Sequence, residues 1–440
     1  MLVLKFGGTS VGKPERMKKI ADLVTDTPGQ KVVVLSALSG TTNALVSIGD
    51  HLMKGDLAAA EKEIAALEAH YQGFISELYG SENFKAIGQE TVSRFFIFIR
   101  LLAAGQFDDK SYRELLAQGE LISTELFYQH LMERKINARL LPALYFMSID
   151  ENEEPELEKI AQRLKPLLNS LKHIDIIITQ GYICRNFKNE IDNLKRGGSD
   201  YTASLIGAAI KADEIQIWTD IDGMHNNDPR VVKKTIPISE LTFDEASELA
   251  YFGAKILHPS TIVPAQKFSV PVRLKNTMDE KAPGTIISNK GTEGTFKAIA
   301  AKDGITAIRI KSSRMLMAYG FLRRVFEVFE SYKTPIDMIT TSEVAVSLTI
   351  DNSSHLEKII HDLSSFATVE IDKDQTIVCI VGQRIGHRQG VLDKIFDCLK
   401  DVPVRMVSAG GSPNNISVLV DTRHKEDTLV RLNEGIFHLA

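Results

Sequence analysis

Cysteine, tryptophan and uninterrupted apolar segments are scarce in this sequence. Its 440 residues include three cysteines and one tryptophan. Cys184, Cys379 and Cys398 lie far apart and form no C-x-x-C pair, so we expect reduced thiols rather than a disulfide framework or a zinc site. The most apolar segment, 95–102, is interrupted by Arg100 and is too short to span a bilayer. The N-terminus has no basic region followed by an apolar core, which argues against a signal peptide and predicts a cytoplasmic protein.

An excess of basic charge is also lacking. The formal net charge is −5, so we expect no general attraction to nucleic acid or to a membrane. No two glycines are spaced G-x-G, which argues against a dinucleotide-binding dehydrogenase. With 44% hydrophobic and 25% charged residues, the composition is that of a soluble globular protein. The length predicts two or three domains.

The first part of the chain, to about residue 290, alternates short β-branched segments with helical patterns. Several of the predicted strands are apolar on both faces, which favours a buried, mostly parallel sheet. A helix-rich insert at 42–134 separates the second strand from the third. The pattern predicts an α/β layered sandwich. The predicted strands are 2–6, 31–36, 138–141, 175–179, 215–219 and 271–275.

The pattern changes after a linker-like segment at 289–294. The order of strands and helices that follows predicts two β-α-β-β-α-β units of the ferredoxin-like type. A paired small repeat at the C-terminus of an enzyme senses a ligand more often than it catalyses. The predicted strands are 296–301, 305–310, 337–341, 344–350, 367–372, 376–381, 403–408 and 415–420, and the predicted helices are 320–332, 354–365, 389–400 and 424–434.

The segment KFGGTSVGKP at 5–14 joins the first strand to a helix. From Gly7 it reads G-x-x-x-x-G-K, but Pro14 stands where a P-loop needs a serine or threonine for magnesium, so we regard that match as accidental. Lys5, at the carboxyl end of the strand, points to the crevice where α/β sheets bind ligands, and two glycines allow close approach to phosphate. An ordinary glycine-rich turn with a solvated lysine explains this segment equally well.

A series of motifs in order along nearly the whole chain breaks that tie. Together with Lys5–Ser10 they resemble the amino acid kinase family, and within it the aspartate kinases. Each motif alone is weak, whereas the ordered set is specific. The further motifs are VVVLSALSGTTN (32–43), LAQGELIST (116–124), TQGYI (179–183), RGGSDYTA (196–203), IWTDIDGM (217–224), DPR (228–230) and FGAKILHP (252–259).

The resemblance implies transfer of the ATP γ-phosphoryl group to the side-chain carboxylate of L-aspartate, giving 4-phospho-L-aspartate, the first step toward lysine, threonine and methionine. The acceptor carboxylate is already ionised at neutral pH, so the reaction needs alignment and charge compensation rather than a general base. The cofactors implied are ATP and Mg²⁺, with the ion held mainly by the ATP phosphates and with no residue assigned as a metal ligand.

The resemblance also implies a set of site residues. Lys5 and Asp200 are the implied catalytic residues. Residues implied to bind ATP are Lys5, Phe6, Gly7, Gly8, Thr219, Asp220, His225, Arg230, Lys255 and Ile256. Residues implied to bind aspartate are Ser36, Thr42, Glu120, Arg196, Gly197, Gly198 and Ser199.

Several of these residues also have plainer interpretations. Ser36 and Thr42 are typical turn and capping residues, and Glu120 taken alone is more often a surface charge on a helix. Ser199 can cap a buried helix. Thr242 and Glu245 form a capping box that opens a helix, whose last turn would hold Lys255 and which would end at His258-Pro259.

The sequence departs from the family pattern in two places. Asp192-Asn193-Leu194-Lys195 replaces a Thr-Thr-Leu-Gly segment before Arg-Gly-Gly, with loss of two hydroxyl groups and a glycine and gain of charge. His225 stands where a tyrosine is common beside the adenine, and Asn226-Asn227 replaces a Thr-Thr pair. We expect altered loop geometry and nucleotide affinity, with activity retained.

The C-terminal repeats resemble paired ACT domains of the lysine-sensitive, single-function aspartate kinases. The implied fold is an amino acid kinase-like three-layer α/β sandwich over 1–291 and a tandem ACT region over 296–440. The first ACT unit would span 305–372, and the second would combine 296–303 with 376–440. The implied partners are lysine as a feedback inhibitor and a second copy in a homodimer, or a tetramer. Residues implied to surround lysine are Met315, Gly320, Leu322, Asp337, Thr341, Ser342 and Glu343.

Two other functions compete with this interpretation. One is another amino acid kinase, acting on glutamate, acetylglutamate or a nucleoside monophosphate, but those kinases lack the combination of Arg-Gly-Gly-Ser-Asp with paired ACT units. The other is a non-catalytic amino acid sensor, which loss of Lys5, Glu120 or Asp200 would favour. All three residues are present.

Overall fold

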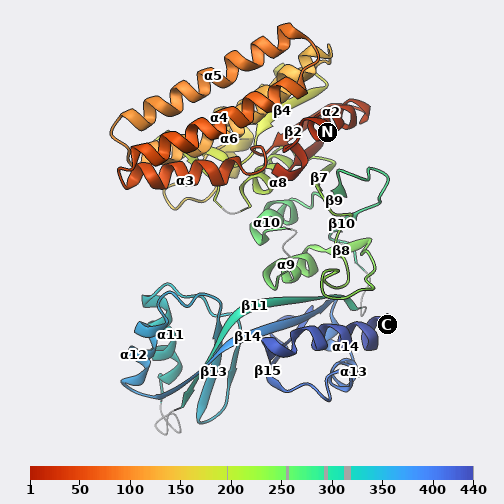
Figure 1. Ribbon diagram of the computed structural model, residues 1–440. Helices are drawn as coiled ribbons and strands as arrows, with labels where there is room; N and C mark the ends of the chain where they lie inside the picture. Colours follow the sequence, from red (N-terminus) through yellow and green to blue (C-terminus); the bar gives the residue numbers. More distant parts are fainter. Residues whose placement is uncertain (196, 254–256, 292–295, 312–318, 440) are drawn as a thin grey trace. The chain divides into compact units, whose positions relative to one another are not determined.

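The computed structural model describes residues 1–195, 197–253, 257–291, 296–311 and 319–439 (Figure 1). Of the predicted site residues, Arg196, Lys255, Ile256 and Met315 lie outside the described part of the chain. The chain forms two compact units, one of residues 1–224 and 257–289, the other of residues 225–256 and 290–440. The segment 225–256, which the sequence places in the kinase region, therefore clusters with the C-terminal residues.

A mostly parallel sheet forms the centre of the first unit. Within this unit the strand order is β3-β4-β2-β1-β7-β9-β10, and only β10 pairs antiparallel to its neighbour β9. The expectation of an α/β sandwich on a mostly parallel sheet is confirmed. The strands are β1 (Leu2–Phe6), β2 (Lys31–Leu35), β3 (Ala138–Leu140), β4 (Ile176–Gln180), β7 (Glu214–Thr219), β9 (Val272–Asn276) and β10 (Thr285–Ser288).

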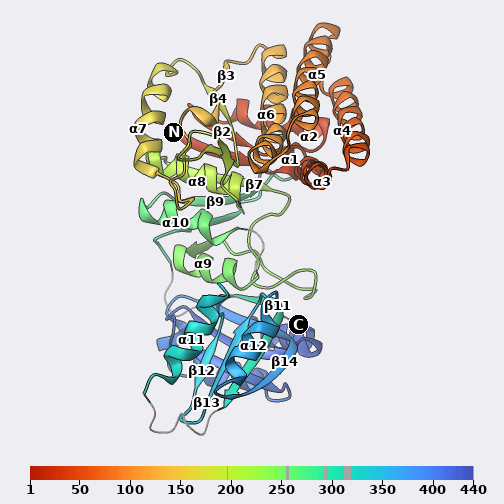
Figure 2. The same ribbon diagram turned by 90° about the vertical axis from the view of Figure 1, so that its left-hand side faces the viewer.

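Helices cover both faces of this sheet (Figure 2). The predicted helical insert forms a bundle on one face, with α6 against β2, β3 and β4, while α8 packs on β1, β2 and β7 from the other face. On the bundle side lie α1 (Gly8–Val11), α2 (Pro14–Asp26), α3 (Thr41–Met53), α4 (Leu57–Leu78), α5 (Glu82–Ala104) and α6 (Asp109–Glu133). The others are η1 (Ala143–Tyr145), α7 (Leu157–Ser170), α8 (Gly198–Ile210) and α10 (Pro259–Lys267).

Alternation along β1 divides its side chains between the two layers. Leu4 and Phe6 enter the apolar core that also holds Met17 and Ile20 of α2. Lys5, one residue away, points to the opposite face, where α8 lies. A single strand therefore supplies core packing on one side and a cation on the other.

A six-stranded antiparallel sheet forms the centre of the second unit, in the order β12-β13-β11-β14-β16-β15. Its two long strands, β11 (Phe296–Lys311) and β14 (Thr368–Gly382), pair along their length, with register shifts around Lys302–Ala307. The remaining elements are β12 (Ile339–Thr341), β13 (Ala345–Ile350), β15 (Val404–Ala409), β16 (Asn415–Asp421), α11 (Phe321–Ser331), α12 (Leu356–Ser364), α13 (Val391–Cys398), α14 (Lys425–Phe437), η2 (Ile385–His387) and η3 (Thr422–His424).

Two pairs of predicted strands prove to be single elements. The segments 296–301 and 305–310 join as β11, and 367–372 and 376–381 join as β14. The irregular residues between each pair are absorbed by the register shifts, so the backbone ladder continues through them. The joined strands tie both ferredoxin-like halves into one sheet.

The segment 225–253 contains the short strand β8 (Glu240–Thr242) and the helix α9 (Phe243–Tyr251). It packs on the antiparallel sheet through α9, which lies against β11 and β14. The capping box of Thr242 and Glu245 is confirmed. The expected continuation of this helix to His258 is wrong, because α9 ends at Tyr251. His258 instead caps α10 with an extended backbone, since the residue before Pro259 avoids the helical region.

The departure at Asn226-Asn227 has a structural explanation within the second unit. The Asn226 side-chain amide donates to Asn433 Oδ1 at 2.9 Å, and that of Asn227 donates to the Leu429 carbonyl oxygen at 3.2 Å. Both asparagines are buried and both partners lie on α14. The two amides therefore attach the segment 225–253 to α14, the last helix of the second unit.

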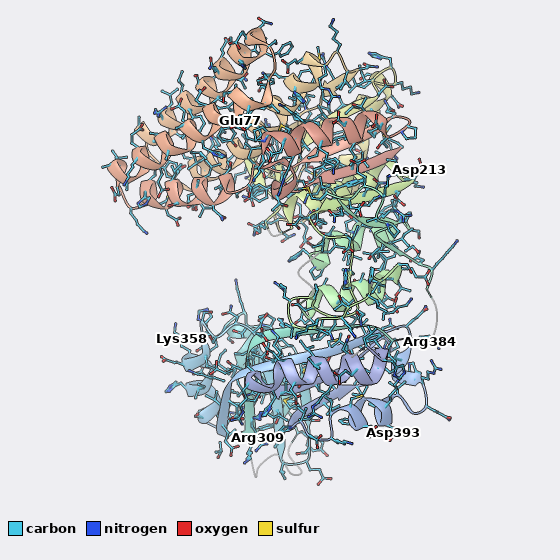
Figure 3. The ribbon with its side chains drawn as sticks, turned by 45° about the vertical axis from the view of Figure 1, so that its right-hand side comes forward. Glu77, Asp213, Arg309, Lys358, Arg384 and Asp393 are labelled. Carbon is cyan, nitrogen blue, oxygen red and sulfur yellow. The ribbon has the colours of Figure 1, made fainter. Side chains whose placement is uncertain are left out.

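The outer faces of helices in both units carry exposed charged side chains, among them Glu77, Lys358 and Asp393 (Figure 3). No helix in the described ranges joins enough length to enough apolar character for a membrane crossing.

The first ferredoxin-like half of the antiparallel sheet depends on one apolar core beneath α11 and α12. Phe329 is 2% exposed and packs there with Val325 and Ile308. We expect Phe329→Ala to cost about 3–5 kcal/mol through lost burial and a residual cavity. Thermal unfolding of the purified chain measures this loss. Glu327→Ala on the same helix, where the side chain is 51% exposed, should change stability by about 0.5 kcal/mol or less, and equal effects would contradict the packing.

Candidate active site

The loops that follow β1, β2 and β4 meet at the carboxyl edge of the parallel sheet and surround a cavity of about 410 Å³. This is the edge at which open α/β sheets bind ligands. The first helical turn of α3 and the buried face of α6 complete its wall. The lining residues are Gly8, Thr9, Ser36, Ala37, Leu38, Ser39, Gly40, Thr42, Asn43, Glu120, Tyr182, Gly198 and Ser199.

Five of the seven residues expected to bind aspartate line this cavity, namely Ser36, Thr42, Glu120, Gly198 and Ser199. Gly197 is adjacent to them as the N-cap of α8. Ser199 lies inside the first turn rather than at the cap, so its expected capping role is wrong: the N-cap is Gly197, two residues earlier, and the helix begins at Gly198.

Lys5 faces Asp200 across the sheet–helix boundary. Its Nζ lies 2.5 Å from Asp200 Oδ1, and the two side chains are 10% and 18% exposed. The two residues expected to be catalytic therefore form one partly buried ion pair. Asp200 stands in the first turn of α8, where the helix dipole favours a negative charge.

Glu120 is buried, contrary to its plainer interpretation as a surface charge. A Cβ atom at position 119 would lie only 2.8 Å from Ala37 Cβ. Because Gly119 has no Cβ, α6 can approach the loop after β2 closely. Glu120 Oε1 accepts a hydrogen bond from the Ala37 N–H at 3.3 Å, while Oε2 is buried without a hydrogen-bond partner. Burial raises the pKa of Glu120 to about 8. This carboxyl group is therefore suited to a cationic ligand.

Tyr182 is a cavity residue that sequence reasoning did not assign to the site. Its φ of 66° is unusual for a bulky residue. Hydrogen bonds hold this conformation, since Tyr182 N–H donates to Thr202 Oγ1 at 3.0 Å and its carbonyl accepts from Leu194 N–H at 2.8 Å. Its ring lies against Gly198, where a Cβ would come within 2.5 Å. Its position in TQGYI, directly after a strand and a glycine, was the available signal.

The residues expected to bind nucleotide are distributed over both compact units. Thr219 ends β7 in the first unit and Asp220 follows it, with a 3.2 Å hydrogen bond from Thr219 Oγ1 to Asp220 Oδ1. His225 and Arg230 belong to the second unit. His225 Nδ1 lies 2.8 Å from Thr235 Oγ1, and Arg230 is 78% exposed and pairs with Asp228 at 2.7 Å.

Of the opening loop residues, Gly7 lies beside the Lys5 ammonium group and Gly8 lies beside the cavity. A Cβ at Gly7 would lie 3.2 Å from Lys5 Nζ, and Gly8 lines the cavity wall. The Phe6 side chain instead stacks on Trp218 in the core, with ring centroids 5.8 Å apart, so only its backbone is available to a ligand. The Ser10 hydroxyl is buried and forms a 2.9 Å hydrogen bond with Thr277 Oγ1, so its interaction is with the protein interior.

The predicted effector residues have two different settings in the second unit. Gly320 caps α11 with φ 84°, and Leu322 on that helix is exposed. Thr341 ends β12, and Ser342 and Glu343 lie in the exposed turn between β12 and β13. Asp337 differs from them, because its side chain is 2% exposed.

A lysine of the chain itself already occupies Asp337. Lys302 Nζ lies 2.8 Å from Asp337 Oδ1 and 2.8 Å from Asp351 Oδ2, and the Tyr251 hydroxyl donates to Asp337 Oδ1 at 3.0 Å. Burial raises the pKa of Asp337, an effect that Lys302 opposes. Asp337 Oδ2 is buried without a hydrogen bond, so one oxygen remains for a further donor.

The fold therefore combines an α/β domain, which has a cavity at the carboxyl edge of a mostly parallel sheet, with a separate antiparallel sheet. Residues 1–276 match the model of the amino acid kinase family, and residues 378–435 match that of the ACT domain. The chain therefore belongs to the amino acid kinase family.

Full-length relatives narrow the comparison to aspartokinases. The chain is 33% identical to lysine-sensitive aspartokinase 3 of Escherichia coli, with 99% of each covered. It is 34% identical to chloroplastic aspartokinase 1 of Arabidopsis thaliana, covering 99% of this chain and 80% of the relative.

The crystal structure of E. coli aspartokinase III with aspartate and ADP matches with a TM-score of 0.85 at 32% identity, covering 99% of this chain and 100% of that one. The same enzyme with lysine and aspartate matches with a TM-score of 0.83, covering 99% of both chains.

The buried Glu120 makes stability depend on pH. Its pKa is about 8 in the folded chain against an ordinary 4.5, so its contribution to stability is fully present below pH 4.5 and is lost as the pH rises through 8. Glu120→Gln should remove this loss and flatten the pH dependence of thermal unfolding across that range. An unaltered pH dependence of thermal unfolding in Glu120→Gln would contradict the assignment.

Proposed function

We propose that the chain is an aspartate kinase that transfers the γ-phosphoryl group of ATP to the side-chain carboxylate of L-aspartate. The observation that carries this proposal is the cavity at the carboxyl edge of the sheet, with an unpaired buried oxygen of Glu120 in its wall. Full-length similarity to aspartokinases supplies the class of reaction. Glutamate is the acceptor that the test must exclude.

The chemistry requires alignment rather than proton transfer. An oxygen of the aspartate side-chain carboxylate attacks the γ-phosphorus, the bond from that phosphorus to the β–γ bridging oxygen breaks, and ADP leaves. The acceptor is ionised near neutral pH, with an ordinary pKa of about 4, so no base has to remove a proton. Repulsion between the two anions is the main obstacle, and cations and N–H donors reduce it.

Lys5 is proposed to stabilise the transferring phosphoryl group, with Asp200 holding the ammonium group in place. The 2.5 Å ion pair fixes the Lys5 Nζ at the end of β1 beside the Gly7-Gly8 turn. The backbone of this turn can approach phosphate closely because neither glycine carries a side chain.

Aspartate recognition is proposed to divide between Glu120 and the loop before α8. Glu120 Oε2 accepts the α-ammonium group, which supplies the cation that its burial demands. Arg196, outside the described residues, is proposed to bind the α-carboxylate through its guanidinium fork. Ser36, Thr42 and Gly197–Ser199 complete the polar wall.

ATP is proposed to bind at the end of β7 with Mg²⁺ entering as part of MgATP. Thr219, Asp220, His225, Arg230, Lys255 and Ile256 are the proposed nucleotide contacts. The described residues hold no group of three or more His, Cys, Asp and Glu side chains placed to bind a metal. Magnesium commonly binds nucleotide phosphates and keeps several waters, so the proposal assigns its ligands chiefly to ATP.

Lysine is proposed as a feedback inhibitor that binds the ACT region of a homodimer. Exposed apolar side chains on α11, β12 and α13 support association of this region, and two such dimers would form a tetramer. These side chains are Leu322, Phe326, Ile339, Leu392 and Phe396. Feedback of this kind needs a coupling of about 1–3 kcal/mol between the lysine and substrate sites.

Trapping the acyl phosphate with hydroxylamine, in the presence of MgATP, tests the reaction directly. We expect aspartyl hydroxamate from aspartate and none from glutamate. Lys5→Met should lower the rate by about 10²–10³-fold, as for loss of one donor to a transferring group. Lys13→Met is the matched control, because Lys13 is the exposed lysine of the accidental P-loop match and should be dispensable.

The opposite pattern, with Lys13 essential and Lys5 dispensable, would restore the P-loop interpretation. Hydroxamate from glutamate alone would make the chain a different amino acid kinase. A folded chain that forms no hydroxamate with either acceptor would favour the sensor.

Lysine inhibition has its own test in the exposed turn after β12. Glu343→Gln removes a carboxylate proposed to hold one lysine ammonium group, and we expect the inhibitory concentration to rise about tenfold or more. Glu357→Gln on α12 should leave it unchanged. An unaltered response in Glu343→Gln would contradict that contact, and activity indifferent to lysine would redirect the search to threonine, methionine or S-adenosylmethionine.

A further inference from the structure

The segment at which this sequence departs from the family pattern ends a small antiparallel hairpin. Its strands are β5 (Ile183–Arg185) and β6 (Ile191–Asn193), and their register pairs Cys184 with Asp192. Glu190 and Asp192 are two residues apart, so their side chains leave the same face of the hairpin. Two neighbouring carboxylates repel each other unless a cation lies between them.

Arg113 of α6 supplies that cation. Its Nε lies 3.4 Å from Asp192 Oδ2, and its Nη2 lies 3.9 Å from Glu190 Oε2. The Arg113, Asp192 and Glu190 side chains are 29%, 17% and 29% exposed, so the attraction is less screened than in a fully solvated pair. The Asn186 side-chain amide reaches both carboxylates at 3.4 Å and completes the cluster.

The hairpin leads from this cluster into the wall of the cavity. Leu194 N–H, two residues after Asp192, donates to the Tyr182 carbonyl at 2.8 Å, which holds Tyr182 in its left-handed conformation. The chain then continues to Lys195, whose carbonyl accepts from Gly198 N–H at 3.2 Å. Tyr182 and Gly198 both line the cavity.

Helix α6 carries both ends of this arrangement. Glu120 is seven residues after Arg113, two turns along the helix, so both residues lie on nearly the same side. The α6 helix also packs directly against β6. The ion pair therefore fixes the Tyr182–Gly198 wall to the helix that presents Glu120.

We propose that Arg113 is a positioning residue of the aspartate site, acting through Asp192 and the β5–β6 hairpin. It touches no reacting atom. It sets the spacing between the wall formed by Tyr182 and Gly198 and the carboxyl group of Glu120. This inference rests on the proposed function, because aspartate must be the ligand of that cavity.

A double-mutant cycle on the full chain tests the pair. We expect R113Q to raise the KM for aspartate by about threefold to thirtyfold. The lower limit corresponds to loss of a partly exposed ion pair, and the upper limit to displacement of the residues that contact the substrate. The KM for ATP should stay within about twofold, because the pair supports only the amino acid wall. D192N should raise the KM for aspartate in the same way, although it changes the size and shape of the side chain less than R113Q does. The double variant should be no worse than the stronger single variant, and R113K should recover part of the loss.

The matched control is R94Q, which breaks an ion pair of 2.6 Å between Arg94 of α5 and Glu125 of α6, neither of which lines the cavity. It should leave both KM values unchanged. An unchanged KM for aspartate in both R113Q and D192N would overturn the proposal, as would additive effects in the double variant or an equal rise in both KM values.

Limited trypsin digestion separates failure of this inference from failure of the proposed function. Lys188 and the exposed Lys195 lie on the hairpin and just after it. R113Q should speed cleavage at both lysines several-fold relative to R94Q, whatever the substrate. If the unaltered chain forms no hydroxamate, the proposed function is refuted. If R113Q and R94Q are cleaved at equal rates, the proposed role of Arg113 in holding the β5–β6 hairpin is refuted.

Discussion

The ion pair between Lys5 and Asp200 is the interaction on which the geometry of the candidate site depends. It joins the end of β1 to the first turn of α8 across 2.5 Å, with both side chains mostly buried. An ammonium group removed from water needs a carboxylate beside it, so the position of α8 and the direction of Lys5 are set together. The N-terminus of α8 further favours the charge on Asp200. Lys5 is thus held ready at the carboxyl edge of the sheet.

Glu120 represents the opposite arrangement, a charge whose partner is not part of the folded chain. Gly119 lets α6 approach the loop after β2, and the price is a carboxyl group whose pKa rises to about 8. An incoming ammonium group favours the ionised form, so binding would release a proton below this pH. The buried Glu120 therefore lowers the stability of the fold at neutral pH but favours binding of a cation, and such a trade-off between stability and function is common at functional sites.

The sequence predicts the layers and strands well because period-two and helical patterns report local burial. It fails where the decisive fact is a distant contact. Glu120 reads as a surface charge since nothing near it in sequence reveals the loop at Ala37 that covers it. Asp337 reads as free for a ligand because Lys302 and Tyr251, which hold it, lie 35 and 86 residues away.

Local rules also compete in ways that only the folded chain decides. Ser199 is a good N-cap by residue type, yet the N-cap is Gly197, two residues earlier. The pair His258-Pro259 can end a helix, because the residue before a proline avoids the helical region, or begin one, because proline is favoured at the first helical position. In the structure Pro259 begins α10. The resemblance of ordered motifs supplied the site residues that no periodicity could identify.

Residues 225–256 cluster with the second unit, although the chain before and after them belongs to the first. The chain leaves the first unit after Met224 and returns at Leu257. Within the second unit Tyr251 ends α9 and donates to Asp337, which also holds Lys302 of the long strand β11. A ligand that binds Asp337, as proposed, would have to compete with Tyr251 and Lys302 for that carboxylate. Feedback inhibition would require that this ligand bind two forms of the chain with different affinity.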